Sequence, residues 1–473
     1  MKITKLSIEN FKKFKDRTEF EFLDQNFFVG ENNTGKTSVI EAINYLLSGS
    51  KKGKEYKNIS SAPEEYIAVE ATISGNFSGI DKKYQDYIID SGDTHYIKLR
   101  RSDEEKEIEQ SSKKTKVKLN ESKILCWSEE RQQFENPSGK DTTFNVVDVV
   151  SVYANDHVDN VVSFDSTKIL GKLIKSRVGD FFETPEYLKF KKHHDDIFNT
   201  GENSLKTQLS SLSNEISDIL KEQWGEVELN FEFDVVDDAS HLKKGSVLVK
   251  EGSVEHGLED KGSGLQRSIM LSMIQVLSKI NIKTESNIIL CIDEPELNLH
   301  PKAQEKLAEA LSRLSNNIQV IISTHSPYVL KSFKKHSDTV YVFANSQFVR
   351  SEKLEKLSVL PFGPTLSEIQ YFAYNLTPND LHNELYGYLE SEGKIGSFST
   401  SKKWLDSRKL LERAEDLAVS VEDVGERDRE LLKRDVSIQT YIRHSIHHPE
   451  NEYNKLYTEE EIEKSISEMI DEI

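Results

Sequence analysis

The stretch of sequence that decides the fold is Gly30-Glu31-Asn32-Asn33-Thr34-Gly35-Lys36-Thr37, which has the spacing Gly-x-x-x-x-Gly-Lys-Thr. An apolar run at 27–29 precedes it and an amphipathic segment at 39–47 follows it. This order of strand, loop and helix is the context that a phosphate-binding loop requires. The competing interpretation is a glycine-rich turn that enters a helix, and the full pattern in this context disfavours it.

The chemistry of phosphate binding explains the residue types of the loop. Glycines let successive backbone N–H groups point at phosphate oxygens, and the helix N-terminus adds a partial positive charge. Lys36 is expected to reach the β- and γ-phosphates, and the hydroxyl of Thr37 to bind Mg²⁺. The predicted cofactors are ATP and Mg²⁺. The residues predicted to bind the nucleotide from this loop are Gly30, Asn32, Asn33, Gly35, Lys36, Thr37 and Ser38.

Composition limits the classes of protein to consider. The chain has 473 residues with a net charge of −19, so it does not read as a basic nucleic-acid binder as a whole. Nucleic acid stays open as a partner through a local basic patch, but the cluster at 113–118 favours a solvated hairpin. The two cysteines, Cys126 and Cys291, lie far apart and suit a reducing compartment.

Targeting signals are not evident in the sequence. No apolar run approaches the ~20 residues that cross a bilayer. The chain starts Met1-Lys2-Ile3 and goes directly into an alternating, strand-like pattern, which is not typical of a signal peptide. We therefore expect a soluble, cytoplasmic protein that makes no contact with a membrane.

A second candidate for the nucleotide site is the apolar run at 287–292 that ends in Asp293 and Glu294. A buried strand that delivers carboxylates at its carboxyl end is where open α/β sheets place ligands. Phosphoryl transfer needs mainly charge neutralisation and positioning, so a metal-binding Asp293 and a water-activating Glu294 could suffice. Taken alone, the pair is equally typical of a strand end that caps the next helix.

Three longer strings accompany the phosphate loop. They are Lys261-Gly262-Ser263-Gly264-Leu265-Gln266-Arg267, Asp293-Glu294-Pro295-Glu296-Leu297-Asn298-Leu299-His300-Pro301 and Ile321-Ile322-Ser323-Thr324-His325-Ser326-Pro327. The first opens a helical pattern, and the third is an apolar run that ends in a lone histidine. Over residues 1–350 the set resembles the ABC-type ATPases of the overcoming-lysogenisation-defect and RecF-like group.

The resemblance implies a fold and a set of roles. The implied fold is α/β, an ABC/RecF-like P-loop NTPase with a β-rich first lobe. Ser263, Gly264 and Gln266 would form a signature loop that contacts ATP held by another protomer. Asp293 would hold the metal, Glu294 would be catalytic, and His325 would sense the γ-phosphate. Such composite sites imply a homodimer, or a higher oligomer, that sandwiches ATP between its heads.

The resemblance also implies a glutamine that contacts metal and water after the first lobe. Gln132 and Gln133 are the candidates, although the stretch 149–156 fits that position and holds no glutamine. A leucine-rich helical pattern at 205–220 is far shorter than the coiled coils of chromosome-maintenance ATPases, which sustain many heptads. The middle region of the chain therefore differs both from the ABC-type group that the chain resembles and from the chromosome-maintenance ATPases.

The domain organisation follows from a change of pattern near Pro361 and Pro364. We predict an ATPase domain over 1–350, with inserted strand and helix segments at about 64–250, and a helical C-terminal domain over 360–473. Thr365 with Glu368, and Thr458 with Glu461, have the spacing of capping boxes that start helices. Ile462, Ile466 and Met469 are expected to form the apolar face of the last helix.

Arg443 and His448 are candidates for a second active site. With four residues between them they resemble the R-x4-H motif of HEPN-domain ribonucleases, which cut RNA without a metal. A separation of five does not align two side chains on a regular helix, so they could converge only where the helix ends, near Pro449. The alternative, which we favour, is a helix end whose Arg and His interact with the dipole.

The C-terminal segment resembles those of ATPase subunits in the bacterial anti-phage systems Septu, PARIS and the retron-linked systems. No Asp-x-Asp pair with an upstream glutamate, typical of a TOPRIM nuclease, follows the ATPase motifs. We therefore predict an ATP-hydrolysing sensor and scaffold subunit in which ATP-driven head dimerisation controls a separate effector nuclease. Two alternatives stay open at this point: a self-contained, ATP-gated HEPN-like ribonuclease, and a RecF-like DNA-repair ATPase.

Overall fold

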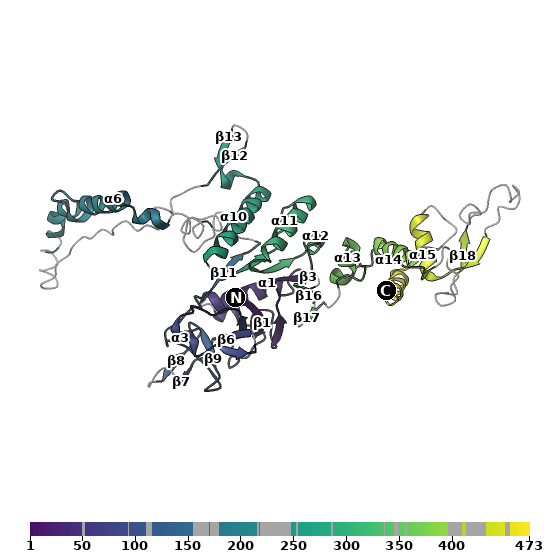
Figure 1. Ribbon diagram of the computed structural model, residues 1–473, viewed down its shortest axis with the longest axis horizontal. Helices are drawn as coiled ribbons and strands as arrows, with labels where there is room; N and C mark the ends of the chain where they lie inside the picture. Colours follow the sequence, from purple (N-terminus) through teal and green to yellow (C-terminus); the bar gives the residue numbers. More distant parts are fainter. Residues whose placement is uncertain are drawn as a thin grey trace. The chain divides into compact units, whose positions relative to one another are not determined.

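The computed structural model of the chain divides into two compact units, which are described separately (Figure 1). The first unit comprises Met1–Phe144 and His300–Ile473, and the second comprises Asn145–Leu299. The structure describes residues 1–49, 53–92, 94–109, 116–154, 170, 179–214, 217, 247–251, 254–284, 287–334, 336–344, 350–354, 357–395, 409–412, 432–449 and 455–473.

An antiparallel sheet of seven strands forms the β-rich lobe of the first unit. Its order is β10-β9-β6-β4-β1-β2, with β5 paired to β6. Ile3, Leu6 and Ile8 of β1 are buried, as their spacing predicts. The strands are β1 (Lys2–Glu9), β2 (Thr18–Glu21), β4 (Ala68–Ser74), β5 (Ile89–Ser91), β6 (Thr94–Ser102), β9 (Leu125–Ser128) and β10 (Gln133–Glu135).

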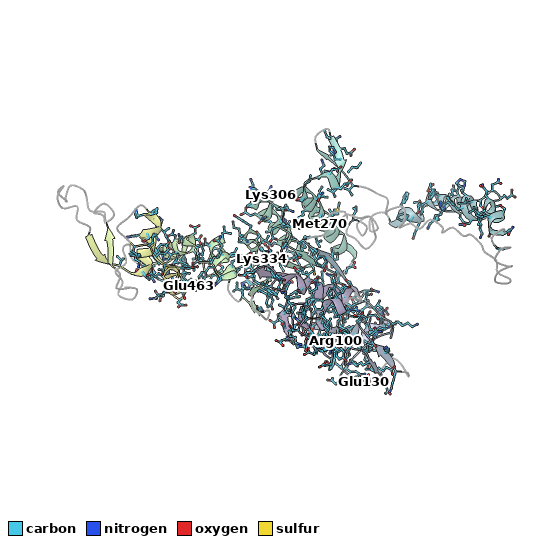
Figure 2. The ribbon with its side chains drawn as sticks, turned by 180° about the vertical axis from the view of Figure 1, so that it is seen from behind. Arg100, Glu130, Met270, Lys306, Lys334 and Glu463 are labelled. Atoms are coloured by element: carbon cyan, nitrogen blue, oxygen red, sulfur yellow. The ribbon has the colours of Figure 1, made fainter. Side chains whose placement is uncertain are left out.

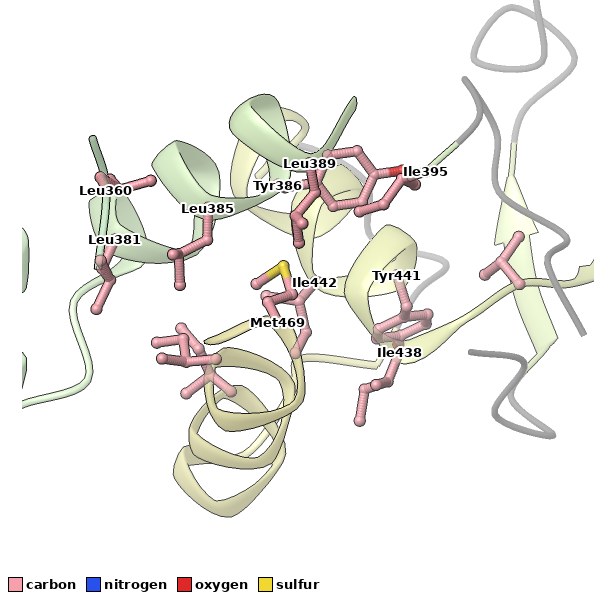
Figure 3. Close-up of a cluster of buried hydrophobic side chains, with 13 residues drawn as sticks. Leu360, Leu381, Leu385, Tyr386, Leu389, Ile395, Ile438, Tyr441, Ile442 and Met469 are labelled. Atoms are coloured by element: carbon pink, nitrogen blue, oxygen red, sulfur yellow. The ribbon is translucent and has the colours of Figure 1, made fainter. Parts of the chain in front are cut away.

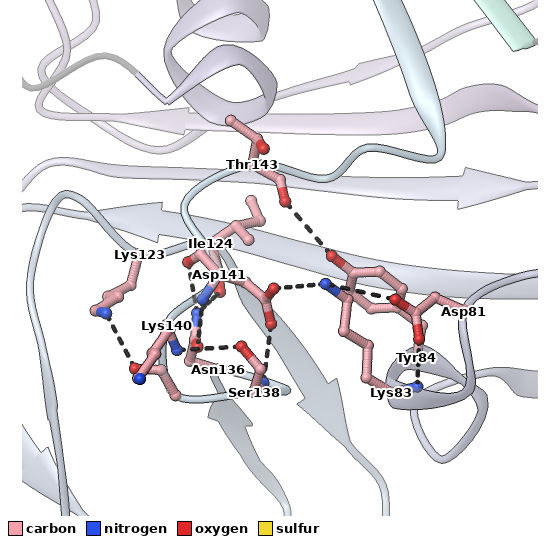
Figure 4. A network of polar contacts seen from close by, with 11 residues as sticks. Asp81, Lys83, Tyr84, Lys123, Ile124, Asn136, Ser138, Lys140, Asp141 and Thr143 are labelled. Atoms are coloured by element: carbon pink, nitrogen blue, oxygen red, sulfur yellow. Dashed lines mark hydrogen bonds and ion pairs between the residues drawn. The ribbon is translucent and has the colours of Figure 1, made fainter.

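A polar network fastens the loop after β10 to the short helix α3 (Lys82–Gln85) (Figure 4). The carboxylate of Asp141 accepts hydrogen bonds from Nζ of Lys83 at 2.6 Å and from the backbone of Ser138 at 2.8 Å. Burial alone would raise the pKa of Asp141, but these donors outweigh it and lower that pKa below its usual value. The ionised carboxylate of Asp141 therefore links the loop after β10 to α3.

The basic cluster at 113–118 lies beside a hairpin, as predicted. Strands β7 (Lys106–Ile108) and β8 (Val117–Leu119) pair in antiparallel fashion. Lys118 is exposed and forms an ion pair with Glu105 at 2.9 Å. Residues 113–115 of the cluster lie outside the described residues.

A second sheet of the first unit carries the phosphate loop. Strand β3 (Gln25–Gly30) runs parallel to β15 (Gln319–Thr324) and to β16 (Asp338–Ala344), and β17 (Arg350–Lys353) pairs antiparallel with β16. Both β3 and β15 are buried along their whole length, which is typical of strands in a parallel sheet. In the sequence, the short helix α2 (Gly53–Tyr56) comes after the helix that follows the phosphate loop.

Three helices accompany this sheet. Helix α1 (Lys36–Ser48) contacts strands of both sheets of the unit and buries the apolar positions that its amphipathic pattern predicts. Helix α11 (Pro301–Leu314) packs on β15 and on α12 (Pro327–Leu330). The phosphate loop is therefore held between a buried strand and a helix that is buried on two sides.

The second unit contains one parallel strand pair and a long helix. Strand β11 (Val147–Val152) pairs with β14 (Asn287–Asp293), and helix α10 (Ser263–Thr284) contacts β14 and buries Met270, which Figure 2 labels. The remaining elements are β12 (Leu248–Glu251), β13 (Val254–Gly257), η1 (Gly179–Glu183), α6 (Pro185–Asp195), the π-helix η2 (Asp196–Thr200), α7 (Leu205–Gln208) and η3 (Leu258–Asp260).

The helical pattern at 205–220 is interrupted. Helix α7 ends at Gln208, where Leu209 leaves helical geometry with φ −86° and ψ 0°, and a helix resumes at 210–214. Most of the rest of that pattern lies outside the described residues.

The C-terminal part of the first unit is built from α13 (Leu366–Tyr374), α14 (Asn379–Ser391), α15 (Ile438–His447) and α16 (Glu459–Ile470). Both predicted capping boxes are confirmed, at Thr365 with Glu368 and at Thr458 with Glu461. The last three helices enclose an apolar core (Figure 3). Its members include Leu385, Leu389, Ile442, Ile462, Ile466 and Met469.

The C-terminal domain, predicted to be helical, also contains two short strands. Strands β18 (Lys409–Glu412) and β19 (Leu432–Asp435) form an antiparallel pair. The two strands are short and rich in charge, so they lack the apolar alternation that signals a strand in sequence. No helix in the described part of the chain has the length and hydropathy needed to cross a membrane.

Candidate nucleotide site

The phosphate loop leaves β3 at Gly30 and enters α1 at Lys36. Three of its residues have backbone conformations in the left-handed region, with φ 133° at Gly30, 63° at Asn33 and 110° at Gly35. A Cβ on Gly30 would lie 2.1 Å from the carbonyl oxygen of Phe343 in β16, so only glycine fits there. Residues 31–33 are exposed at the tip. This curled backbone has the geometry of an anion-binding nest.

Lys36 is folded over the loop that contains it. Its side chain is buried, and its Nζ donates to the carbonyl oxygens of Gly30 at 3.0 Å and Glu31 at 2.6 Å. The hydroxyl of Thr34 closes the same turn by donating to Glu31 at 2.8 Å. The first turn of α1, all of it described, contains no acidic residue. The positive end of the helix dipole and the lysine charge therefore act at one place.

His325 reaches the phosphate loop through strand register. Thr324, the last residue of β15, pairs with Val29 of β3, so His325 follows at the level of Gly30. Next to it, Ser326 caps α12 by accepting a hydrogen bond from the backbone of Tyr328 at 3.1 Å. The hydroxyl of Ser326 also donates to Gln304 on α11 at 2.5 Å. The turn that carries His325 is therefore fixed on both sides.

In the second unit, Asp293 and Glu294 stand at the carboxyl end of β14. Asp293 is buried, and Glu294 is half-buried with a left-handed backbone, φ 46°. The carbonyl oxygen of Glu294 accepts a hydrogen bond from the backbone of Leu297 at 3.1 Å, which begins the turn toward His300. A buried aspartate followed by a constrained glutamate is suited to separate metal-binding and water-activating roles.

The predicted signature loop opens α10. Gly262 and Ser263 are exposed at the start of the helix, and a Cβ added to Gly264 would lie 3.4 Å from the carbonyl oxygen of Asn298, an ordinary contact. The side-chain amide of Gln266 donates to the carbonyl oxygens of Leu258 at 3.0 Å and Glu259 at 3.3 Å. Gln266 thus fixes the turn before the helix, and its predicted contact with nucleotide stays a prediction.

A further residue of this unit was missed from sequence. Arg267 is buried on the first turn of α10, and its guanidinium donates to the carbonyl oxygens of Glu294 at 3.1 Å and Ala154 at 2.8 Å. The sequence signal that could have identified it is an arginine between the apolar positions of an otherwise amphipathic helix.

The two glutamines proposed for the metal contact are placed elsewhere. Gln132 and Gln133 belong to the β9–β10 hairpin at one edge of the antiparallel sheet, in the region that Arg100 and Glu130 mark in Figure 2. The amide of Gln132 donates to Glu129 at 2.8 Å, and that of Gln133 donates to Glu109 at 2.7 Å. Both side chains are used within this lobe, so the structure does not bring them to the phosphate loop.

The residues proposed for Mg²⁺ fit that ion chemically. The hydroxyl of Thr37 and the carboxylate of Asp293 are hard oxygen donors, and Mg²⁺ is usually held by one or two such groups together with phosphates and water. Among the described residues, no group of three or more His, Cys, Asp or Glu side chains forms a metal cluster.

Arg443 and His448 occupy the end of α15. Arg443 lies over the ring of Tyr386, with 4.3 Å from its Cζ to the ring centroid, and its Nη2 is 3.5 Å from Glu390 on α14. His448 is the C-cap of α15, and its ring packs against His444 at 6.5 Å between centroids. Arg443 therefore links α15 to α14, while the catalytic role and the dipole interaction considered from sequence both stay predictions.

Comparisons with known proteins address the ATPase part of the chain. A model of the AAA ATPase domain family matches residues 1–330. Old nuclease of Escherichia phage P2 is 28% identical over 388 residues, covering 76% of this chain and 62% of that protein. Endonuclease GajA of Bacillus cereus is 22% identical over 390 residues, covering 76% of this chain and 59% of that protein. The chain thus spans about 60% of the length of these two relatives.

Shorter and structural similarities complete the comparison. The retron Vc95 probable ATPase of Vibrio cholerae is 36% identical over 80 residues, covering 17% of this chain and 15% of that protein. An SMC head domain from Thermotoga maritima is 14% identical with a TM-score of 0.36, covering 75% of this chain and 100% of that one. An Smc head bound to the C-terminal winged-helix domain of ScpA is 14% identical with a TM-score of 0.41, covering 75% and 98%.

Proposed function

The chain belongs to the AAA ATPase domain family, and from that premise we propose that it is the ATP-hydrolysing sensor and scaffold subunit of a bacterial anti-phage system. Family membership confirms the ATPase class predicted from the phosphate loop. Similarity to Old nuclease and endonuclease GajA confirms the predicted resemblance to the overcoming-lysogenisation-defect group. These relatives, named as nucleases, do not favour the DNA-repair alternative.

The observation that carries the ATPase part of the proposal is the folded phosphate loop. Three of its residues have left-handed backbone conformations, and the buried ammonium of Lys36 donates to the loop's own carbonyl groups. On nucleotide binding, the ammonium of Lys36 exchanges these carbonyl oxygens for phosphate oxygens. Because the lysine charge is already positioned, little reorganisation is needed when the phosphates arrive.

Mg²⁺, when bound with ATP, neutralises charge that develops on the transferred phosphoryl group. The chain's own residues supply the rest of the chemistry. Thr37 and Asp293 bind and orient the ion, and Glu294 takes a proton from the attacking water. His325 follows a strand whose register fixes it at the level of Gly30, where it senses the γ-phosphate.

A second copy of the chain completes the site in this proposal. The exposed start of α10, at Ser263 and Gly264, offers a helix N-terminus suited to an anion. We place it against the γ-phosphate of ATP held by the other protomer, so that ATP binding closes a homodimer and hydrolysis opens it. ATP then acts as a switch of association.

The switch is proposed to control an effector nuclease on a separate chain. Old nuclease and endonuclease GajA extend beyond the segments that this chain matches, and an 80-residue segment is also similar to a protein named as a retron probable ATPase. The helical C-terminal domain, with its own core, is the part we assign to holding the effector. The closing and opening of the two ATPase heads would determine whether the C-terminal domain holds or releases the effector.

The test uses the full chain with and without the genes that neighbour it. The purified chain is expected to hydrolyse ATP and to leave double-stranded DNA and RNA intact in Mg²⁺ or Mn²⁺. Cells that carry the chain with its neighbouring genes are expected to resist phage, and the Glu294→Gln variant is expected to abolish resistance. Robust metal-dependent DNA cleavage by the purified chain alone would overturn the separate effector.

A further inference from the structure

A single arginine side chain joins three functional elements of the second unit. The guanidinium of Arg267, on the first turn of α10, donates through Nη1 to the carbonyl oxygen of Glu294 at 3.1 Å. Its Nη2 donates to the carbonyl oxygen of Ala154 at 2.8 Å. Glu294 follows β14 and Ala154 follows β11, so one planar group bridges the ends of two strands.

The strand register explains why an arginine is needed at this point. The β11–β14 ladder is parallel, and its last pair is Val152 with Ile292. Ala154 and Glu294 each come two residues after that pair, beyond the end of the ladder, and the carbonyl oxygen of Glu294 also accepts a hydrogen bond from the backbone of Leu297 at 3.1 Å. A guanidinium is a rigid fork with several N–H donors, and it can satisfy two such acceptors at once.

The contact from Arg267 also bears on the backbone conformation of Glu294. Its φ of 46° lies in the left-handed region, which is strained for a non-glycine residue. Such a conformation persists only where surrounding contacts determine it. The carbonyl group of Glu294 is held in this conformation by two hydrogen bonds, one from Arg267 and one from the backbone of Leu297.

Arg267 is also tied to the start of α10. It lies one turn from Ser263, and the neighbouring Gln266 bonds to the turn at Leu258 and Glu259. Since Arg267 is buried and donates to both carbonyl groups, a shift of the start of α10 would strain or break its hydrogen bond to Glu294. We therefore expect the signature loop at the start of α10 and Glu294 to move together.

We propose that Arg267 is a positioning residue. When the signature loop at the start of α10 contacts ATP held by the other protomer, Arg267 passes the resulting movement to Glu294. This inference rests on the proposed function, because it assigns the base to Glu294 and the signature turn to the other protomer's ATP. In the open state, Arg267 holds Glu294 in its left-handed conformation. When the start of α10 meets the γ-phosphate, the guanidinium carries the adjustment to Glu294, and the dimer then hydrolyses ATP.

The test compares Arg267→Ala, Arg267→Gln and Arg267→Lys in the full-length protein, with Arg313→Ala as the matched control. Arg313 is an exposed arginine of α11 that pairs with Glu309 one turn away. The measurements are thermal unfolding, equilibrium binding of a fluorescent ATP analogue, and kcat and KM for ATP hydrolysis. Arg267→Ala is expected to lower kcat about 100-fold and to leave KM within about twofold, because misplacing a catalytic group by about 1 Å costs this much.

The conservative variants separate positioning from packing. Lysine can reach one carbonyl group but not both, so Arg267→Lys is expected to recover part of kcat, and Arg267→Gln less. If Arg267→Ala fails to fold, the kcat of Arg267→Lys relative to that of the wild type still tests whether Arg267 positions Glu294. A kcat within twofold of the wild type in folded Arg267→Lys and Arg267→Gln would overturn the inference, as would a loss of kcat that merely follows the unfolded fraction.

Failure of the inference is distinguishable from failure of the proposed function. An active wild type with unaffected Arg267 variants would overturn only the coupling role. A wild type that binds no ATP and hydrolyses none would overturn the proposed function, and the inference with it.

Discussion

The Nζ of Lys36 lies 3.0 Å from the carbonyl oxygen of Gly30, the residue at which the phosphate loop begins. The lysine therefore spans its own loop, from the first residue of α1 back to the last residue of β3. Two properties depend on this contact: the curled form of the loop and the position of a positive charge inside it. Each can be removed separately by substitution.

The Lys36→Ala variant is expected to lose ATP binding and to keep its fold. The substitution removes the buried ammonium that we assign to the β- and γ-phosphates, and alanine favours the helix that begins here. Isothermal titration with ATP and Mg²⁺ measures binding, and circular dichroism measures the fold. Lys302→Ala, an exposed lysine on the first turn of α11, is the control. Normal ATP affinity in Lys36→Ala would show that the loop is not the nucleotide site.

The Glu294→Gln variant is expected to bind ATP normally, to hydrolyse it at least ~100-fold more slowly, and to accumulate as a closed dimer. Glutamine keeps the size of the side chain but cannot accept a proton, so only the chemical step is lost. Multi-angle light scattering with and without ATP measures the dimer. Hydrolysis at the wild-type rate would remove Glu294 from the base role, and a monomer in saturating ATP would remove the proposed composite site.

The Gly30→Ala variant is expected to disrupt the loop. The new Cβ would meet the carbonyl oxygen of Phe343 at 2.1 Å, and φ of 133° is strained for any L-residue. We expect a loss of several kcal/mol of stability, or a displaced β16 with loss of ATP binding. Gly387→Ala is the control, since nothing lies within 4 Å of a Cβ there and the residue sits inside α14. That change should stabilise the chain by roughly 0.5–1 kcal/mol.

The elements predicted well from sequence are those set by local chemistry or by burial. The capping boxes at Thr365 and Thr458 need only residues three positions apart, so their pattern identifies a helix start before any packing is known. Strands β3 and β15 read as continuous apolar runs because both are buried on two faces. Once such strands lie parallel, their carboxyl ends share an edge, which places His325 by register.

The features missed from sequence depend on contacts between distant residues. Arg267 reaches Ala154 across more than a hundred positions, and nothing local marks the carbonyl group that it satisfies. Gln132 and Gln133 were candidates through the resemblance alone, and the hairpin that uses them is formed by β9 and β10. Strands β18 and β19 have the sequences Lys-Leu-Leu-Glu and Leu-Lys-Arg-Asp, which lack the alternation of apolar and polar residues that identifies a strand.

Stability of the C-terminal helices is expected to fall as the pH drops below 6.5. Burial, and then the charge of Arg443, lower the pKa of His382 to about 3 in the folded chain. The unfolded chain takes up this proton near pH 6.5, so the contribution of a neutral His382 is complete above 6.5 and is lost progressively toward pH 3. The slope from this group is at most about 1.4 kcal/mol per pH unit.

The measurement for His382 is thermal unfolding of the wild type and His382→Gln between pH 7.5 and 5. Glutamine can still bond to the hydroxyl of Ser465, which lies 2.9 Å from Nε2 of His382, but it does not titrate. The wild type should lose more stability than the variant across this range, whereas exposed His336→Gln should follow the wild type. Parallel pH profiles for His382→Gln and the wild type would contradict the assignment.

The last prediction separates the two interpretations of Arg443 and His448. Arg443 lies over the ring of Tyr386 and beside Glu390, and its Nη1 is a buried atom without a hydrogen-bond partner among the described residues. If the arginine is an interhelical contact, Arg443→Ala should cost about 1–3 kcal/mol of stability through the lost cation–π and ionic contacts. His448→Ala, at a helix end, should leave the unfolding temperature nearly unchanged. Neither variant should alter phage resistance once expression is matched.

The ribonuclease interpretation makes the opposite forecast for the same two variants. Both would fold normally, and both would abolish RNA cleavage that persists in EDTA, because a His and Arg pair needs no metal. The decisive experiment incubates purified wild type, Arg443→Ala and His448→Ala with single-stranded RNA in EDTA and ATP, beside thermal unfolding of each. We expect no cleavage by any of the three proteins. Cleavage by the wild type that disappears in folded His448→Ala would establish an active site at the end of α15, and would move the effector into this chain.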